Sequence, residues 1–275
     1  MDRLCNAVDV HAHFGQSVLG APSLLGQPPE GTPARVVARA RAAGVRLTFV
    51  SALQALWPRG AGNPIQGNLA AVRAVDEFPE DLRFWCVLSP KQEETFAQAR
   101  ELLTHPRCIG LKVHPVEHRY EIREFGTRIF EFAAERGAIV QSHSGEPGSW
   151  PADFVPLADA FPTVRLILSH LGCGADGLLD HQVRAVKAAR HHNIWTDTSS
   201  AQSMRADLIE RAVALIGADR ILFGTDSPLY STGAQVARIA LAELTEKEKA
   251  AIFRENAASL FGLAKAAPRP KTRSK

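Results

Sequence analysis

A chain of 275 residues, of which 45% are hydrophobic and 22% charged, has the composition of a globular protein with a sizeable core. It contains no apolar run near the roughly 20 residues that a membrane span needs, which argues against a membrane protein. The formal charge of +3 arises at the C-terminal end, and no basic patch elsewhere indicates nucleic-acid binding.

The last twelve residues, 264–275, are basic. They contain Lys265, Arg269, Lys271, Arg273 and Lys275, which leaves the remainder of the chain mildly acidic. We expect residues 1–263 to form one domain and residues 264–275 to be a disordered, solvated tail. A tether to nucleic acid or membrane is the alternative, and a basic patch on the domain would be needed to favour it.

The N-terminus and the cysteines indicate a cytoplasmic protein. Residues 1–4 lead almost directly into a strand and lack a secretory signal pattern. Cys5, Cys86, Cys108 and Cys173 are scattered without a Cys-x-x-Cys pair, which is typical of a reducing compartment. We expect the first three to pack as small hydrophobic residues, whereas Cys173 lies in a Gly-rich loop.

Predicted strands and helices alternate along the whole chain. The first strand runs into the stretch 8–15, and the others are expected at 45–50, 82–88, 109–113, 138–142, 164–169, 193–198 and 220–224. Helices are expected at 34–43, 65–78, 92–103, 121–136, 151–161, 178–191 and 205–216, with a final one from Glu246 that Thr245 and Glu248 begin as a capping box. The loop 15–33 is long for a compact domain, and loops of that length tend to be functional lids or disordered segments.

Eight strand–helix units predict an α/β fold, a single-domain (β/α)8 TIM barrel. An open doubly wound sheet is the alternative. No Gly-rich phosphate fingerprint follows the first strand, which disfavours a dinucleotide-binding version of that fold.

Polar residues follow several of these strands. His11 and His13 alternate with Ala12, so both imidazoles point the same way and are suited to a divalent metal such as zinc. In a barrel, Lys112, His143, His170 and Asp226 would reach the same mouth from later strands. Each of these residues alone has a structural explanation, such as a hydrogen bond, a turn or an ion pair, but their shared position favours a metal site. Zinc fits the donor set best, with manganese or iron as alternatives.

These motifs resemble the amidohydrolase superfamily, in particular its amidohydrolase-related branch of TIM-barrel metal hydrolases and decarboxylases. The resemblance rests on the stretches 8–13 (VDVHAH), 110–115 (GLKVHP), 141–145 (QSHSG), 168–172 (LSHLG), 195–199 (WTDTS) and 222–228 (LFGTDSP), and on a closing helix around 256–263.

The resemblance implies roles for individual residues. His11, His13, His143 and Asp226 would ligate a first metal. His170 would ligate a second metal or bind the catalytic water, and Lys112 matches a lysine that binuclear members carbamylate. Whether one or two ions bind stays open.

The expected function is a metal-dependent hydrolase, in which metal-activated water attacks the carbonyl of a small lactone, amide or ester. Asp226 would take the proton of that water and deliver it to the leaving group. A metal-dependent non-oxidative decarboxylase and a metal-free lactonase are the alternatives. We expect a small-molecule substrate and no nucleic-acid or membrane partner; a homo-oligomer is possible.

The substrate end of the site is less defined. Arg59 and Arg119 lie in loops at the expected mouth and could bind a substrate carboxylate, although they could equally be solvated charges. Asp197, at the end of the seventh strand, is a candidate for contacting the substrate or supporting a ligand. His114 could support the site from behind, and Trp57, Trp150 and Tyr230 could line the pocket.

Overall fold

The computed structural model describes residues 6–15 and 31–263. The predictions for Cys5, for most of the loop 15–33 and for the tail 264–275 lie outside these residues. Within the described part, no helix is both long and apolar enough to cross a membrane.

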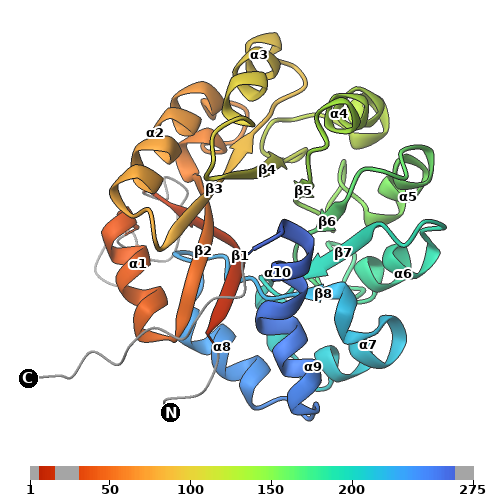
Figure 1. Ribbon diagram of the computed structural model, residues 1–275. Helices are drawn as coiled ribbons and strands as arrows, with labels where there is room; N and C mark the ends of the chain where they lie inside the picture. Colours follow the sequence, from red (N-terminus) through yellow and green to blue (C-terminus); the bar gives the residue numbers. More distant parts are fainter. Residues whose placement is uncertain (1–5, 16–30, 264–275) are drawn as a thin grey trace, which may run out of the picture.

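Eight parallel strands pair in chain order from β1 to β8 and form the predicted barrel (Figure 1). They are β1 (Ala7–Phe14), β2 (Val45–Ala52), β3 (Leu82–Val87), β4 (Cys108–Val113), β5 (Val140–Ser142), β6 (Leu166–Leu168), β7 (Ile194–Asp197) and β8 (Ile221–Leu222). The ring closes where the chain after β8 meets β1, with Val10 N donating to Phe223 O at 2.9 Å and Asp226 N donating to His11 O at 2.8 Å. The prediction of a single-domain (β/α)8 barrel is confirmed.

Helices surround the strands (Figure 1). They are α1 (Pro33–Ala42), α2 (Pro64–Glu77), α3 (Glu93–Leu102), α4 (Ile122–Arg136), α5 (Pro151–Ala160), α6 (His181–Ala188), α7 (Leu208–Ile216), α8 (Thr232–Ala240), α9 (Glu246–Ala250) and α10 (Asn256–Phe261). Short helical turns lie at Leu53–Ala55, Ala201–Met204 and Ala218–Arg220.

Two features of the C-terminal third differ from the sequence prediction. Helix α8 was not predicted; Ser231 caps it through a bond from Ala234 N, and Val236 and Ile239 are its buried apolar residues. The final helix begins at the predicted capping box, but a π-helical turn at Ala251–Glu255 divides it into α9 and α10. The eighth strand therefore has its own helix, and the last helical segment is an addition to the barrel.

The lower interior of the barrel is apolar. Val8, Val10, Phe49 and Trp85 pack there with Leu260 of α10, which lies across the centre of the ring in Figure 1. The ring of Phe261 meets the rings of Phe49 and Trp85 at 4.9 and 5.7 Å. Helix α10 thus covers one end of the barrel and keeps water out of its core.

The pairing of β1 with β2 shifts register between Asp9 and Ala12. Val10 packs inside the barrel, whereas Ala12 and Phe14 pack with the helices outside it. An extra residue in a strand turns the following side chains to the other face. The shift therefore turns His11 and His13 toward the interior at the open mouth.

Candidate metal centre

The centre of the mouth is formed by His11, His13 and Asp226. Asp226 Oδ1 lies 3.1 Å from His13 Nε2 and 3.6 Å from His11 Nε2. One ligand atom from each residue falls within 4.8 Å of the others, and all three side chains are buried. Two imidazoles and a carboxylate at this spacing are ligands that a divalent transition metal can bind.

Asp226 and His170 reach the centre through unusual backbone conformations. Both have positive φ angles, 55° for Asp226 and 73° for His170, which non-glycine residues rarely adopt. Each follows the last residues of its strand, where the left-handed turn directs the side chain into the mouth. Hydrogen bonds from Thr225 N and Asp226 N to His11 O hold the turn after β8 in place.

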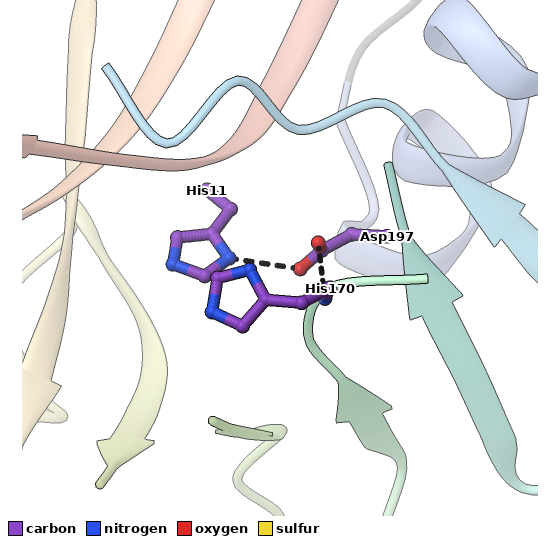
Figure 2. A group of neighbouring side chains, drawn as sticks. All are labelled: His11, His170 and Asp197. Atoms are coloured by element: carbon purple, nitrogen blue, oxygen red, sulfur yellow. Dashed lines mark hydrogen bonds and ion pairs between the residues drawn. The ribbon is translucent and has the colours of Figure 1, made fainter. Parts of the chain in front are cut away.

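The ring of His11 is oriented by Asp197 (Figure 2). Its Nδ1 lies 3.0 Å from Asp197 Oδ2, and because a carboxylate only accepts, Nδ1 carries the proton. The lone pair of the neutral ring is then on Nε2, which faces Asp226. Burial, reinforced by the charge of Lys112, lowers the pKa of His11 to about 4, so the imidazole is neutral near pH 7, as a metal ligand must be.

His170 is held in the same way. Ser199 Oγ donates to Asp197 Oδ1 and lies 2.8 Å from His170 Nδ1, so the histidine donates to the hydroxyl. The backbone N–H of His170 also donates to Asp197 Oδ1 at 3.0 Å. His170 consequently presents Nε2 to the cavity, and burial places its pKa well below the ordinary value.

Neither tautomer of His13 is fixed by its neighbours, so its proton can lie on Nδ1 or on Nε2. Ser51 Oγ lies 2.9 Å from its Nδ1, and a hydroxyl can donate or accept. With Ser51 accepting, Nε2 is free to bind a cation beside Asp226. Burial disfavours the charged form of Asp226, but the hydrogen bond from His13 and the nearby His11 outweigh it and hold its pKa below the usual value.

A second group of possible ligands comprises His11, His170 and Asp197, shown in Figure 2. Its carboxylate is already used, because Asp197 accepts bonds from His11, His170, Ser199 and Gln141. The direct contact between His11 Nδ1 and Asp197 leaves no room for an ion. Asp197 therefore orients two histidines, and the group containing Asp226 is the better metal site.

Lys112 lies deep in the mouth beside His11. Its Nζ is 3.0 Å from His11 Nε2, 3.2 Å from Gln141 Oε1 and 3.4 Å from Ser169 Oγ. Burial lowers its pKa to about 8, and the nearby charges of Asp197 and Asp226 oppose that effect only in part. The amine competes for the lone pair of His11 while it is protonated.

His143 lines the same cavity but is not part of the tight group. Its Nε2 lies 2.5 Å from Glu146 Oε2, and its ring stacks on His114 at 4.1 Å. Its buried Nδ1 has no hydrogen-bond partner among the described residues, and its ring is 4.9 Å from His170. An unpartnered buried nitrogen is an atom that a bound cation could satisfy.

A cavity of about 300 Å³ opens next to these residues. Trp57, Leu56, Leu229 and Tyr230 form apolar and aromatic walls, and the polar lining includes Glu117, Glu146 and Cys173. Trp57 and Tyr230 were candidates from the sequence, whereas Trp150 instead contacts His181 with ring centroids 5.1 Å apart. Glu117 and Glu146 were not singled out, because nothing in a loop sequence shows which side chains turn inward.

None of the three substrate-contact candidates lines this cavity. Arg59 pairs with Glu117 behind the wall, and its side chain is 49% exposed. Arg119 lines a separate surface depression with Lys91 and Tyr120. Asp197 is fully buried behind His11. The structure thus brings together the histidines, Lys112 and Asp226, and leaves the two arginines outside.

The sequence from residue 8 to residue 263 matches the amidohydrolase family model. The chain therefore belongs to the amidohydrolase family. No curated protein sequence matches it.

Several solved structures of decarboxylases have the same fold as this chain. The 5-carboxyvanillate decarboxylase of Sphingomonas paucimobilis superposes with a TM-score of 0.73 at 14% identity, over 94% of this chain and 99% of that chain. A dihydroxybenzoic acid decarboxylase of Polaromonas with bound manganese gives 0.72 at 17% identity, over 94% and 98%. The 2,6-dihydroxybenzoate decarboxylase of Rhizobium gives 0.70 at 14% identity, over 94% and 98%. At such identities the likeness establishes the fold.

Proposed function

We propose that this chain is a metal-dependent decarboxylase of small ring-containing carboxylic acids. The observation that carries the proposal is the pairing of a His11–His13–Asp226 centre with a small cavity that has aromatic walls. The likeness over the whole chain to decarboxylases of hydroxylated benzoates, one with bound manganese, supports it. The comparisons favour this alternative over the hydrolysis that the sequence suggested first.

The metal in this proposal is Mn²⁺ or Zn²⁺. His11, His13 and Asp226 would hold it, and His143 could add a fourth ligand through its unpartnered Nδ1. When bound, the ion supplies a Lewis acid that anchors the substrate oxygens and withdraws electrons from the ring. The manganese of the Polaromonas enzyme supports manganese as the first ion to test.

The side chains would then orient the acid and move one proton. Trp57 and Tyr230 would enclose the ring and keep the carboxylate at the centre. Asp226, ionised before reaction, would accept the proton of a ring hydroxyl and return it to the ring carbon that carries the carboxylate. The carbon–carbon bond breaks, CO₂ leaves, that carbon keeps the proton, and the hydroxyl oxygen is left as an oxyanion, so atoms and charge balance.

Hydrolysis of a lactone, amide or ester is the second candidate, and Lys112 favours it. A buried amine with a pKa near 8 is partly neutral at physiological pH, and a neutral amine can react with CO₂ to give a carbamate. A carbamate is an anionic oxygen ligand, which would allow a second ion beside His170. In this case Asp226 would accept the proton of the attacking water.

Product analysis separates the two functions. Manganese- or zinc-loaded enzyme is incubated with hydroxybenzoates and with lactones, and CO₂ release and acid release are measured. The proposal expects CO₂ from the acids, and a loss of about 10² to 10⁴ in rate for Asp226→Asn with the fold retained. Acid release from lactones alone would overturn decarboxylation, and turnover by chelated enzyme would overturn the metal requirement.

We place the enzyme in the cytoplasm, as expected from the scattered cysteines. Cys86, Cys108 and Cys173 are free thiols in the structure. Its partner in this proposal is a small-molecule substrate.

A further inference from the structure

The cavity beside the metal centre has two carboxylates that the proposed chemistry does not use. Glu117 follows β4 and Glu146 follows β5, and both line the cavity near the stacked rings of His114 and His143. Carboxylates in a cavity wall are costly unless donors satisfy them. In each of the two carboxylates, one oxygen accepts hydrogen bonds from a neighbouring side chain, and the other oxygen accepts none from the described residues.

Glu117 is fixed from behind by Arg59. Its Oε1 accepts from Arg59 Nη2 at 3.0 Å and from Arg59 Nε at 3.2 Å, and its backbone N–H donates to His114 Nδ1. The residue is only 4% exposed. Its second oxygen, Oε2, is buried and has no hydrogen-bond partner in the part of the chain that the structure describes. Such an atom is a ready acceptor for a ligand.

Glu146 is fixed by His143. Its Oε2 accepts from His143 Nε2 at 2.5 Å, and its backbone carbonyl accepts from Ser149 N at 2.9 Å. The side chain of Glu146 is 35% exposed, so it faces the open side of the cavity. No described residue donates to its other oxygen. Glu146 therefore also presents an acceptor to anything that enters.

The charges divide the cavity into two halves. Lys112 is the one lining cation among the described residues, and it lies against His11 at the metal end. Glu117 and Glu146 lie instead beside His114 and His143. A ligand that fits both halves has an electron-rich group at the metal and a hydrogen-bond donor at its far end.

We infer that the substrate is dipolar: it carries an N–H or O–H donor, best a protonated amine, that binds Glu117 and Glu146. A second carboxylate at that position is disfavoured by the charges of the two glutamates, which Arg59 offsets only in part. The inference rests on the proposed function only in placing the reacting carboxylate at the metal. It makes Arg59 a positioning residue that aims Glu117, instead of a residue that binds a substrate carboxylate.

Binding of four matched ring acids to the manganese-loaded full chain tests the inference without turnover. The probes are 3-(aminomethyl)benzoate, 3-(hydroxymethyl)benzoate, 3-methylbenzoate and isophthalate, and calorimetry gives each Kd. A hydrogen bond to a charged group predicts that the amine binds about 10- to 100-fold more tightly than the methyl probe. The hydroxymethyl probe should fall between them, and isophthalate should bind more weakly than all three.

Two variants locate the preference. Glu146→Gln and Glu117→Gln keep the side-chain size but remove the charge, and each should cut the advantage of the amine over 3-methylbenzoate about tenfold. Glu135→Gln, on the exposed face of α4, is the control and should change neither. If Glu117→Gln fails to fold, the partly exposed Glu146 still supports the test.

Several results would overturn the inference: isophthalate binding as tightly as the amine, an amine advantage that survives both variants, or no measurable binding of the amine. These outcomes are separate from the failure of decarboxylation. A panel that binds in the expected order but releases no CO₂ would reject the proposed reaction and keep the donor preference.

Discussion

His11 Nδ1 donates to Asp197 Oδ2 across 3.0 Å, inside a fully buried network that also holds His170 (Figure 2). One carboxylate at the end of β7 thereby sets the tautomer of a histidine from β1 and the backbone of a histidine after β6. Both rings consequently turn their Nε2 atoms to the cavity. The geometry of the candidate metal centre thus depends on a residue that stands behind its histidines.

The first prediction concerns this carboxylate. In Asp197→Asn the amide can donate to His11 Nδ1, which favours the tautomer with the proton on Nε2. We expect manganese affinity to fall about 10- to 100-fold, as for other partners of metal-bound histidines. Titration of the metal-free protein with Mn²⁺ measures the effect, and circular dichroism checks the fold. Asp207→Asn, at an exposed position, is the matched control; unchanged affinity in Asp197→Asn would contradict the role.

The barrel was predictable because its signal is repeated. Eight apolar strands alternate with helices, and each repeat supports the same architecture. Helix α8 was missed because its nine residues follow a Pro-containing turn and only a few of them, such as Val236 and Ile239, form its apolar face. The register shift in β1 also leaves no mark in a sequence that alternates regularly through His11 and His13.

The site was predictable to the extent that strand ends define it. His11 and His13 lie in the last half of β1, and His170 and Asp226 come shortly after β6 and β8, so the barrel alone brings them together. Arg59, Glu117 and Glu146 belong to loops, whose path depends on hydrogen bonds such as Gly60 N to Glu117 O, and these are invisible in the sequence. The role of Asp197 required the distances to His11 and His170.

The second prediction concerns Lys112. While its Nζ is protonated, it donates to the His11 Nε2 lone pair that a metal needs. With a pKa of about 8, the ammonium form predominates at lower pH, so we expect metal affinity to rise by up to about tenfold per pH unit from pH 6.5 to 8 and then to level off. Lys112→Met should flatten this rise. Calorimetric titration with Mn²⁺ across the range measures both proteins.

Bicarbonate provides the internal test of that prediction. Tighter metal binding on adding bicarbonate, seen with the native chain and lost in Lys112→Met, would indicate a carbamate and favour the hydrolytic candidate. Identical pH dependence in the two proteins would show that the amine does not compete with the metal.

The third prediction concerns the cap at the other end of the barrel. Phe261→Ala removes a ring that meets Phe49 and Trp85 edge to face. We expect a loss of about 3 kcal/mol in the free energy of unfolding, typical of truncating a packed aromatic residue. Urea denaturation measures this loss.

The control is Leu241→Ala, at an 82% exposed position, which should change stability by less than about 0.5 kcal/mol. Metal affinity should not change, and a large loss of it would show that the cap also shapes the mouth.

The last prediction concerns Asp9, which ties β1 to the turn after β8. Its carboxyl accepts from Thr225 Oγ1 at 2.6 Å and from the backbone N–H groups of Thr225 and His11 at 3.1 Å. Burial raises its pKa to about 8, above the ordinary value of 3.8. The folded chain therefore keeps a proton that the unfolded chain releases, and stability from this group is lost as the pH rises from about 4 to about 8. The variant Asp9→Asn tests this expectation, because it removes the titration and keeps one acceptor oxygen.

We expect the free energy of unfolding of the native chain, relative to this variant, to fall by about 3 kcal/mol between pH 5 and pH 8. Urea denaturation at both pH values measures this difference, and the exposed substitution Asp219→Asn should give a difference that does not vary with pH. A constant difference for Asp9→Asn would mean that Asp9 is ionised in the folded chain and binds Thr225 as a carboxylate.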